Sequence, residues 1–319
     1  MRVSISKPLA IYEIGGRPNQ EDSIYPKYGD ASEDNKVFVL CDGMGGHEKG
    51  EAASSLVCSE MSKYIYENWD ESGFTDSILF GAVNTVLDKL EVLNDNTDRR
   101  PGTTLTLLVF HKGGVLAAHI GDSRIYHIRP SEKRILYKSR DHSLVYDMLA
   151  SGEISISEMR NYKKKNVITR ALIPGQESRP KPAAVHITDL KEGDYFFMCS
   201  DGMLEQMNDE ELVECFCDNI EDEKKQEGLI KRTSENKDNH SAYIIKITNV
   251  ELEEGDDQLK NDESSSPCNA LLLEQQATTD VYSVKKSSRK LFSNILLVKY
   301  VLFILLFVVL LLFILKLVF

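Results

Sequence analysis

The sequence predicts an α+β domain with antiparallel sheet at its centre and helices packed outside it. Short β-rich runs come in pairs joined by short turns, as in 104–110 with 115–120 and 124–129 with 134–138. Such connections join antiparallel strands, because a parallel pair needs a long crossover. Residues 50–69 and 76–94 instead have the apolar periodicity of helices, each with one face that covers a sheet.

Composition divides the 319 residues into three parts. Residues 1–248 carry the strand and helix patterns and form the predicted folded domain. Residues 249–290 are first acidic and serine-containing, then basic, and are poor in aromatic side chains, which is typical of a flexible linker. Residues 291–319 form the third part, a predicted transmembrane anchor.

The anchor is predicted from an apolar run between Ile295 and Phe319 that only Lys299 and Lys316 interrupt. About 20 such residues are enough to cross a bilayer as a helix. The basic segment 285–290 directly precedes the run, and the positive-inside tendency places that side in the cytoplasm. We therefore expect a single-pass membrane protein whose folded domain is cytoplasmic and whose C-terminal helix contacts the lipid bilayer.

Charge and cysteine usage narrow the class of protein further. The formal net charge is -12, which argues against nucleic acid as a partner. The six cysteines are scattered and contain no CxxC pair, as expected of reduced thiols in a cytosolic domain.

Four aspartates lie at the ends of apolar, strand-like runs, where a sheet can bring them to one edge: Asp42, Asp122, Asp201 and Asp238. A single Asp-Gly is usually only a turn, but a turn explains four such sites poorly. Clustered carboxylates repel one another unless cations neutralise them, and oxygen ligands suit Mg²⁺ or Mn²⁺. A pair of such ions supports hydrolysis at phosphorus. The early Arg17 offers a fork for phosphoryl oxygens, although a surface arginine in a loop is the plain alternative.

Eight ordered blocks resemble the metal-dependent serine/threonine protein phosphatases of the 2C type, in their bacterial form. The resemblance covers residues 10–248 and implies a central β-sandwich flanked by helices, in four layers. It also implies that phosphoserine and phosphothreonine in proteins are the substrates and that a serine/threonine kinase acts in opposition. The blocks are "RPNQEDS", "VLCDGMGGHEKGEAAS", "GTTLTLLVF", "AAHIGDSRIYHIR", "RDHSLVYDMLASGEIS", "NVITRAL", "FFMCSDGM" and "DNHSAYIIKI".

The resemblance assigns metal ligands residue by residue. Asp42 corresponds to the carboxylate that bridges two Mg²⁺ or Mn²⁺ ions, and the Gly43 carbonyl to a ligand of one of them. Asp201 and Asp238 correspond to ligands of the second ion. Asp122 corresponds to the ligand of a weaker third ion that some members bind.

The same resemblance assigns the groups that handle substrate and water. Arg17 corresponds to the phosphate-binding arginine, and Glu21 and Asp22 to the acidic pair that holds metal-bound waters. Some relatives have histidine directly after the Asp-Gly, where it is proposed to protonate the leaving oxygen, but this chain has Met44. The identity of the general acid therefore stays open, as do two rival functions: an inactive phosphoprotein-binding scaffold and a hydrolase of small phosphoesters.

Overall fold

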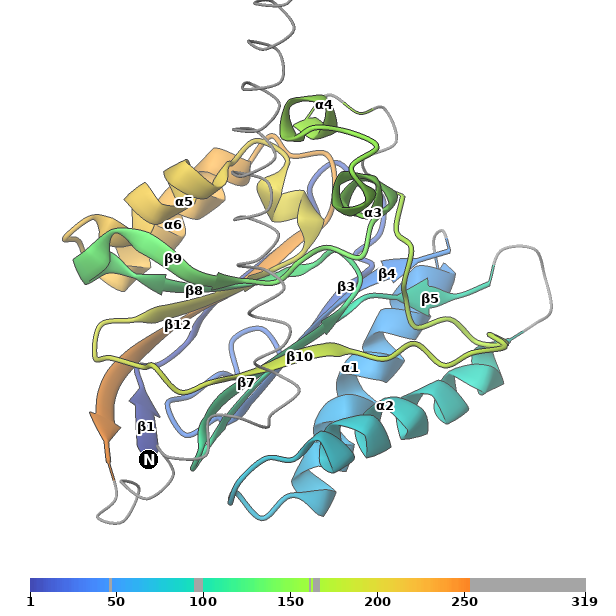
Figure 1. Ribbon diagram of the computed structural model, residues 1–319, viewed down its shortest axis with the longest axis horizontal. Helices are drawn as coiled ribbons and strands as arrows, with labels where there is room; N and C mark the ends of the chain where they lie inside the picture. Colours follow the sequence, from blue (N-terminus) through green and yellow to red (C-terminus); the bar gives the residue numbers. More distant parts are fainter. Residues whose placement is uncertain (46–47, 95–99, 161, 163–166, 253–319) are drawn as a thin grey trace, which may run out of the picture. The chain divides into compact units, whose positions relative to one another are not determined.

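The computed structural model describes residues 1–45, 48–94, 100–160, 162 and 167–252. Within these residues, strands pair into two six-stranded antiparallel sheets (Figure 1). The first sheet contains β1 (Arg2–Ile5), β2 (Leu9–Glu13), β8 (Arg124–Arg129), β9 (Arg134–Lys138), β11 (Tyr195–Cys199) and β12 (His240–Glu251). Its order is β1-β12-β11-β8-β9, and β2 also pairs with β12.

Within the same residues, the second sheet also has six strands. It contains β3 (Asp22–Tyr25), β4 (Val37–Met44), β5 (Gly102–Thr103), β6 (Leu105–His111), β7 (Gly114–Ile120) and β10 (Ala183–Ile187). Its order is β10-β7-β6-β4-β3, with β5 paired to the end of β4. The two predicted hairpins are confirmed, since β6 pairs with β7 and β8 pairs with β9.

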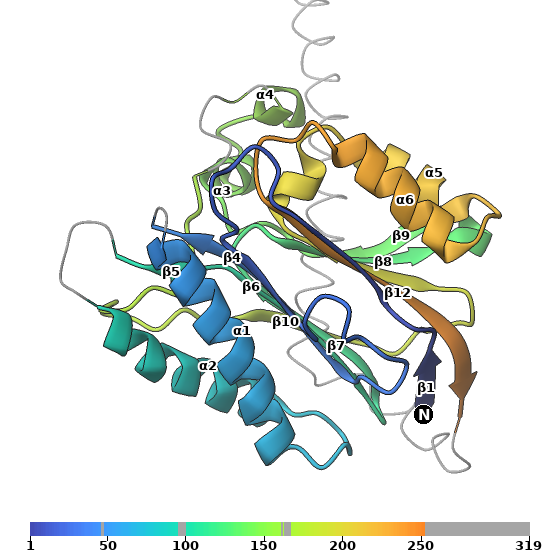
Figure 2. The ribbon, with the colours of Figure 1, turned by 180° about the vertical axis from the view of Figure 1, so that it is seen from behind.

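Helices cover the outer face of each sheet, as Figures 1 and 2 show from opposite sides. Helices α1 (Glu48–Asn68) and α2 (Asp76–Leu90) pack on the second sheet, and α5 (Asp209–Cys217) and α6 (Asp222–Thr233) on the first. This arrangement confirms the predicted layered α+β sandwich. Shorter elements complete the described chain: η1 (Glu91–Leu93), η2 (Pro130–Glu132), α3 (Leu144–Ser151), α4 (Ile156–Arg160) and η3 (Asp201–Leu204).

The long helices form where an apolar stripe meets a sheet. In α1, Ala53, Val57, Met61 and Ile65 recur at fourth positions and are all fully buried. This spacing puts them on one face of the helix, which packs against β4. Helix α5 begins instead with a capping box: the Asn208 side chain accepts from the Glu211 N–H, and the Asn208 N–H donates to the Glu211 carboxylate.

Aromatic side chains fill the space between the sheets. The Phe38 ring from the second sheet meets Tyr243 from the first at a centroid distance of 5.3 Å. Phe110 and Phe196 make the same kind of contact at 5.7 Å. Edge-to-face pairs of this kind add to the apolar burial that holds two sheets together.

Two boundaries differ from the sequence predictions. Strand β4 continues through Met44, so Asp42 lies inside a strand and not at its end, because β5 pairs with the last residues of β4. Strand β12 runs to Glu251 and therefore crosses the predicted domain boundary at 248, because β1 pairs with its final residues.

The described ranges contain no helix that is both long and apolar enough to cross a membrane. The predicted span at 291–319 and most of the predicted linker at 249–290 lie outside those ranges.

Candidate metal centre

The second sheet contributes Asp22 and Asp42 as direct neighbours. Strands β3 and β4 are antiparallel, and their register pairs Asp22 with Asp42. Asp22 is only 1% exposed, and its Oδ2 accepts a bond of 2.8 Å from the Ser200 hydroxyl, which belongs to the first sheet's side of the molecule. The two sheets are thus linked at the point where these carboxylates lie.

The first sheet contributes Asp201 and Asp238 from two adjacent strands. Asp201 begins η3 just after β11, and Asp238 comes just before β12. Strands β11 and β12 pair with Cys199 opposite Ala242, so the residues beyond these ends meet at the same edge of the sheet. This antiparallel pairing brings together two aspartates that are far apart in the sequence.

Asp122 lies in the tight turn between β7 and β8. Gly121, which precedes it, has a φ of 110°, and a Cβ there would lie 2.6 Å from the Thr104 side chain. Thr104 in turn receives a bond of 2.9 Å from the Asp42 N–H, and its hydroxyl lies 2.8 Å from that of Ser123. A short chain of hydrogen bonds therefore joins the turn of Asp122 to the backbone of Asp42.

The electrostatics show that these aspartates share one environment. Burial raises the pKa of Asp42 well above its usual range, and repulsion from Asp22, Asp201, Asp122 and Asp238 adds to it. Burial is also the first cause that raises the pKa of Asp22 to about 7, of Asp122 to about 8 and of Asp201 to about 6. Repulsion from a neighbouring aspartate raises each of these values further.

The atoms that these residues offer to a metal ion are oxygens, which suit hard cations. Asp22 Oδ1 and Asp122 Oδ1 are buried and have no hydrogen-bond partner in the described part of the chain. A cation would satisfy such oxygens and relieve the mutual repulsion of the carboxylates. Among the described residues, no three Asp, Glu, His or Cys side chains are arranged to hold an ion by themselves, and the predicted set also relies on the Gly43 carbonyl.

Close packing explains why residue 43 is a glycine. A Cβ at Gly43 would lie 2.3 Å from the carbonyl oxygen of Gly50 and 2.6 Å from that of Glu21. The Gly43 N–H also donates to the Glu21 carbonyl at 3.0 Å. The beginning of α1 and Glu21, the residue before β3, thus leave no room for a side chain at position 43. Gly50 also lies close to the Glu21 carboxylate.

Arg17 lies beside one of the predicted ligands. Its Nη2 donates to Asp238 Oδ2 at 2.6 Å, and half of the Arg17 side chain is exposed. The hydrogen bond to Asp238 is the main cause that raises the pKa of Arg17, and the charges of Glu21 and Asp42 add to it. A cationic fork therefore stands at the exposed side of the carboxylate cluster.

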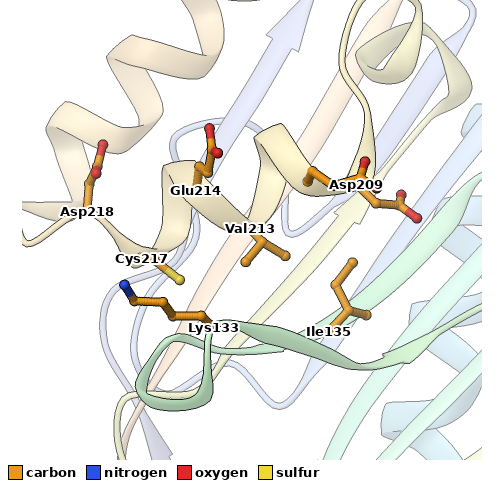
Figure 3. A pocket seen from close by; sticks show the side chains of 8 residues that line it. Lys133, Ile135, Asp209, Val213, Glu214, Cys217 and Asp218 are labelled. Atoms are coloured by element: carbon orange, nitrogen blue, oxygen red, sulfur yellow. The ribbon is translucent and has the colours of Figure 1, made fainter.

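A hollow of about 560 Å³ lies elsewhere, between β9 and α5 (Figure 3). None of the predicted site residues lines it. Its lining is Lys133, Ile135, Asp209, Glu210, Val213, Glu214, Cys217 and Asp218.

Sequence reasoning missed the residues that hold the aspartates in place. Ser200 and Thr104 were not singled out, although each bonds an aspartate of the cluster or its backbone. The only signal is their position: Ser200 directly precedes Asp201, and Thr104 directly follows β5. A hydroxyl beside a predicted ligand is too common a pattern to predict such a role.

Comparison with known sequences agrees with this geometry. The sequence model of the protein phosphatase 2C family matches residues 14–235. A putative protein phosphatase 2C-type of Streptococcus pyogenes is 28% identical over 226 residues, which cover 67% of this chain and 86% of that protein. The serine/threonine protein phosphatase PstP of Mycobacterium tuberculosis is 30% identical over 203 residues, which cover 62% of this chain and only 36% of PstP.

Solved structures show the same fold. The crystal structure of PstP from Mycobacterium tuberculosis has a TM-score of 0.65 and 27% identity, and covers 77% of this chain and 100% of that one. The PstP catalytic domain was also solved with two manganese ions, and this structure has a TM-score of 0.62, 27% identity and the same coverage. Stp1 of Staphylococcus aureus has a TM-score of 0.66 and 25% identity, and covers 78% of this chain and 98% of that one.

A helix-covered β-sandwich with acidic side chains gathered from both sheets defines the class: a serine/threonine protein phosphatase. The chain belongs to the protein phosphatase 2C family.

Proposed function

We propose that the chain hydrolyses phosphoserine and phosphothreonine in proteins with the help of two Mg²⁺ or Mn²⁺ ions. The observation that carries the proposal is the shared rise in the pKa values of Asp22, Asp42, Asp122 and Asp201, caused by burial and by mutual repulsion. A protein rarely keeps such carboxylates together unless a cation joins them.

The ligands would be Asp42, the Gly43 carbonyl, Asp201 and Asp238, with Asp122 for a third ion. When bound, the ions supply a water of lowered pKa as nucleophile and neutralise charge that develops at phosphorus. The chain's acidic oxygens hold the ions in place, and the family's PstP structure with two manganese ions supports this reading.

Arg17, Glu21 and Asp22 would act on substrate and water. The exposed guanidinium of Arg17 can bind two oxygens of the phosphoryl group and orient it toward the carboxylate cluster. Asp22, with a free Oδ1, and Glu21, which adjoins Gly43 and Gly50, would orient waters at that cluster.

The proton for the leaving serine or threonine oxygen must come from a group other than Met44, since a thioether carries no transferable proton. Met44 ends β4 directly after the predicted ligands. His47 lies outside the described residues. The general acid is therefore the open part of the mechanism, and a water at the centre can serve.

The test is hydrolysis of a phosphothreonine peptide by the full chain, with Mn²⁺ and with chelator. Asp201→Asn should lower kcat by more than about 100-fold, because even the outer partners of metal ligands are worth about 10- to 100-fold. Asp218→Asn, an exposed aspartate at the end of α5, is the matched control and should keep activity. Activity that persists in chelator or in Asp201→Asn would contradict the metal mechanism.

The same assay separates the rival functions. A hydrolase of small phosphoesters would show no preference for the phosphopeptide over p-nitrophenyl phosphate. A phosphoprotein-binding scaffold would bind Mn²⁺ and the phosphopeptide without turnover.

We also propose that residues 291–319 anchor the catalytic domain to a membrane on its cytoplasmic side and that a serine/threonine kinase opposes its activity. The support is the apolar run with the basic segment before it. Truncation after Asp280 should move the protein from the membrane fraction to the soluble fraction without loss of phosphatase activity. Continued membrane association of the truncated chain would contradict the anchor.

A further inference from the structure

The loop that carries Arg17 crosses from one sheet to the other. It spans residues 14–21, between β2 of the first sheet and β3 of the second. A loop that leaves one sheet for another has no strand partner of its own to fix its path. The position of Arg17 relative to the carboxylates therefore depends on what holds residues 14–21.

The Asn239 side chain makes three hydrogen bonds to the backbone of this loop. Its Nδ2 donates to the carbonyls of Ile14 at 2.8 Å and Asn19 at 2.9 Å, and its Oδ1 accepts from the Glu21 N–H at 2.8 Å. Asn239 is only 5% exposed. Its anchors lie on both sides of Arg17 in the sequence.

The bonds require the chemistry of a carboxamide. Two carbonyls need a group with two N–H donors, and one N–H needs an acceptor, so both hydrogens of Nδ2 and the oxygen are used. Aspartate would place oxygen against two carbonyl oxygens, and alanine would leave three backbone groups without this partner.

Two glycines bring the loop into direct contact with the segment of Asn239. Gly15 has a φ of 62°, and a Cβ there would lie 2.2 Å from the Asp238 carbonyl oxygen. The Gly16 N–H donates to the Lys237 carbonyl at 3.1 Å. Arg17 follows immediately, and its guanidinium reaches the Asp238 carboxylate at 2.6 Å.

We propose that Asn239 is a positioning residue: it fixes the loop so that Arg17 and the carboxylate of Asp238 face the same phosphoryl group. The proposal rests on the proposed function, because it gives the Arg17 guanidinium the task of binding phosphate. Asn239 thereby affects phosphate binding by positioning Arg17, in addition to any contribution that its hydrogen bonds make to folding.

The experiment is a double-mutant cycle on the full chain with Arg17→Ala, Asn239→Ala and the combined variant. The readouts are kcat and KM for a phosphothreonine peptide at saturating Mn²⁺, and calorimetric binding of inorganic phosphate to the Mn²⁺-loaded chain. Asn239→Ala should lower kcat/KM by about 10-fold or more, since a misplacement of about 1 Å can cost about 100-fold. With Arg17 already removed, the same change should cost less than about 2-fold.

Two further variants keep the test decisive. Asn208→Ala removes the N-cap of α5 and so perturbs folding without touching the loop, and its effect should be the same with and without Arg17. Gly15→Ala disturbs the junction from the loop side and should behave like Asn239→Ala, which covers the case that Asn239→Ala does not fold. Calorimetric Mn²⁺ affinity should stay within about 2-fold in Asn239→Ala, as expected of action through Arg17 and not through Asp238.

Equal losses from Asn239→Ala in both backgrounds, in kcat/KM or in phosphate affinity, would overturn the positioning role. A wild-type chain that binds phosphate but does not hydrolyse the peptide would count against the proposed function, and the phosphate affinities would still decide the role of Asn239. Absence of both binding and hydrolysis would overturn both.

Discussion

Two buried carboxylate sites in this domain behave in opposite ways. At the metal centre, the pKa of Asp122 is raised to about 8, first by burial and then by the charge of Asp201. The second site is formed by Asp194, Arg129 and His127. Burial also acts to raise the pKa of Asp194, but hydrogen bonds from Arg129 and His127 prevail and lower it to about 2. Asp194 is as deeply buried as Asp22, since each is 1% exposed.

The two sites differ in the source of the positive charge that neutralises their carboxylates. Both Asp194 oxygens accept from Arg129 at 2.8 Å, and His127 lies 2.9 Å from Oδ2. The chain thus completes this site by itself, and the site serves the fold. At the metal centre, Arg17 pairs with Asp238 at the exposed side. The charge of Arg124 acts to lower the pKa of Asp122, but burial and repulsion between carboxylates prevail and raise it. The ions of the proposed mechanism would complete this charge balance.

The largest expected effect on stability comes from the self-contained site. Asp194→Asn should lower the free energy of unfolding by about 3 kcal/mol, because it leaves the buried Arg129 without its main counter-charge. Urea denaturation measures this change. Per folded molecule, phosphatase activity at low temperature should match the wild type, and a selective loss of activity would link the two sites.

The same substitution at the metal centre should have the reverse effect. Asp42→Asn should abolish phosphatase activity, by more than about 100-fold, because it removes the predicted bridging ligand. In chelator at pH 8 it should leave the domain as stable as the wild type or more stable, since one repelling carboxylate is gone. Urea denaturation in chelator would contradict the comparison if Asp42→Asn lost as much stability as Asp194→Asn.

The smallest effect is a difference in pH dependence. Unfolded aspartate titrates near 3.9, whereas folded Asp201, Asp22 and Asp122 have pKa values of about 6, 7 and 8. Between pH 4 and 8 the folded state therefore binds more protons than the unfolded state, so stability in chelator should fall as pH rises through this window. The contribution of Asp194, whose folded pKa is lowered, is present above pH 4 and is lost only as pH falls toward 2.

Mn²⁺ should cancel the fall in stability between pH 4 and 8, because ions replace the protons that the carboxylates hold. Mn²⁺ added at pH 6.5 in weak buffer should release protons, which a pH electrode or calorimetry in two buffers detects. Metal binding without proton release would mean that the aspartates are already ionised.

The sequence predicted the layered fold and a set of aspartates that share one environment in it, but not the residues that hold these aspartates in place. The apolar run before Asp201 and the apolar run after Asp238 indicate strand ends, and adjacent strands bring such ends together whatever the intervening sequence. Asp42 was placed at a strand end, but its strand continues, because the pairing with β5 depends on a segment far along the chain.

Long-range contacts account for the rest. The need for glycine at position 43 arises from Gly50 and Glu21, which approach it only in the folded domain. The bonds of Asn239 reach a loop more than 200 residues away in sequence. No local pattern of hydrophobicity or turn chemistry encodes such approaches.

The pairing of β1 with the end of β12 has a consequence for synthesis of the protein. Residues Arg2–Ile5 find their partners only at Ile247–Glu251, and β2 pairs with the beginning of the same strand. During translation the first strands must therefore wait, unpaired, until nearly the whole domain has left the ribosome. Because Asp238 and Asn239 directly precede β12, a nascent chain or one terminated before these residues would lack a proposed metal ligand and the proposed anchor of the Arg17 loop.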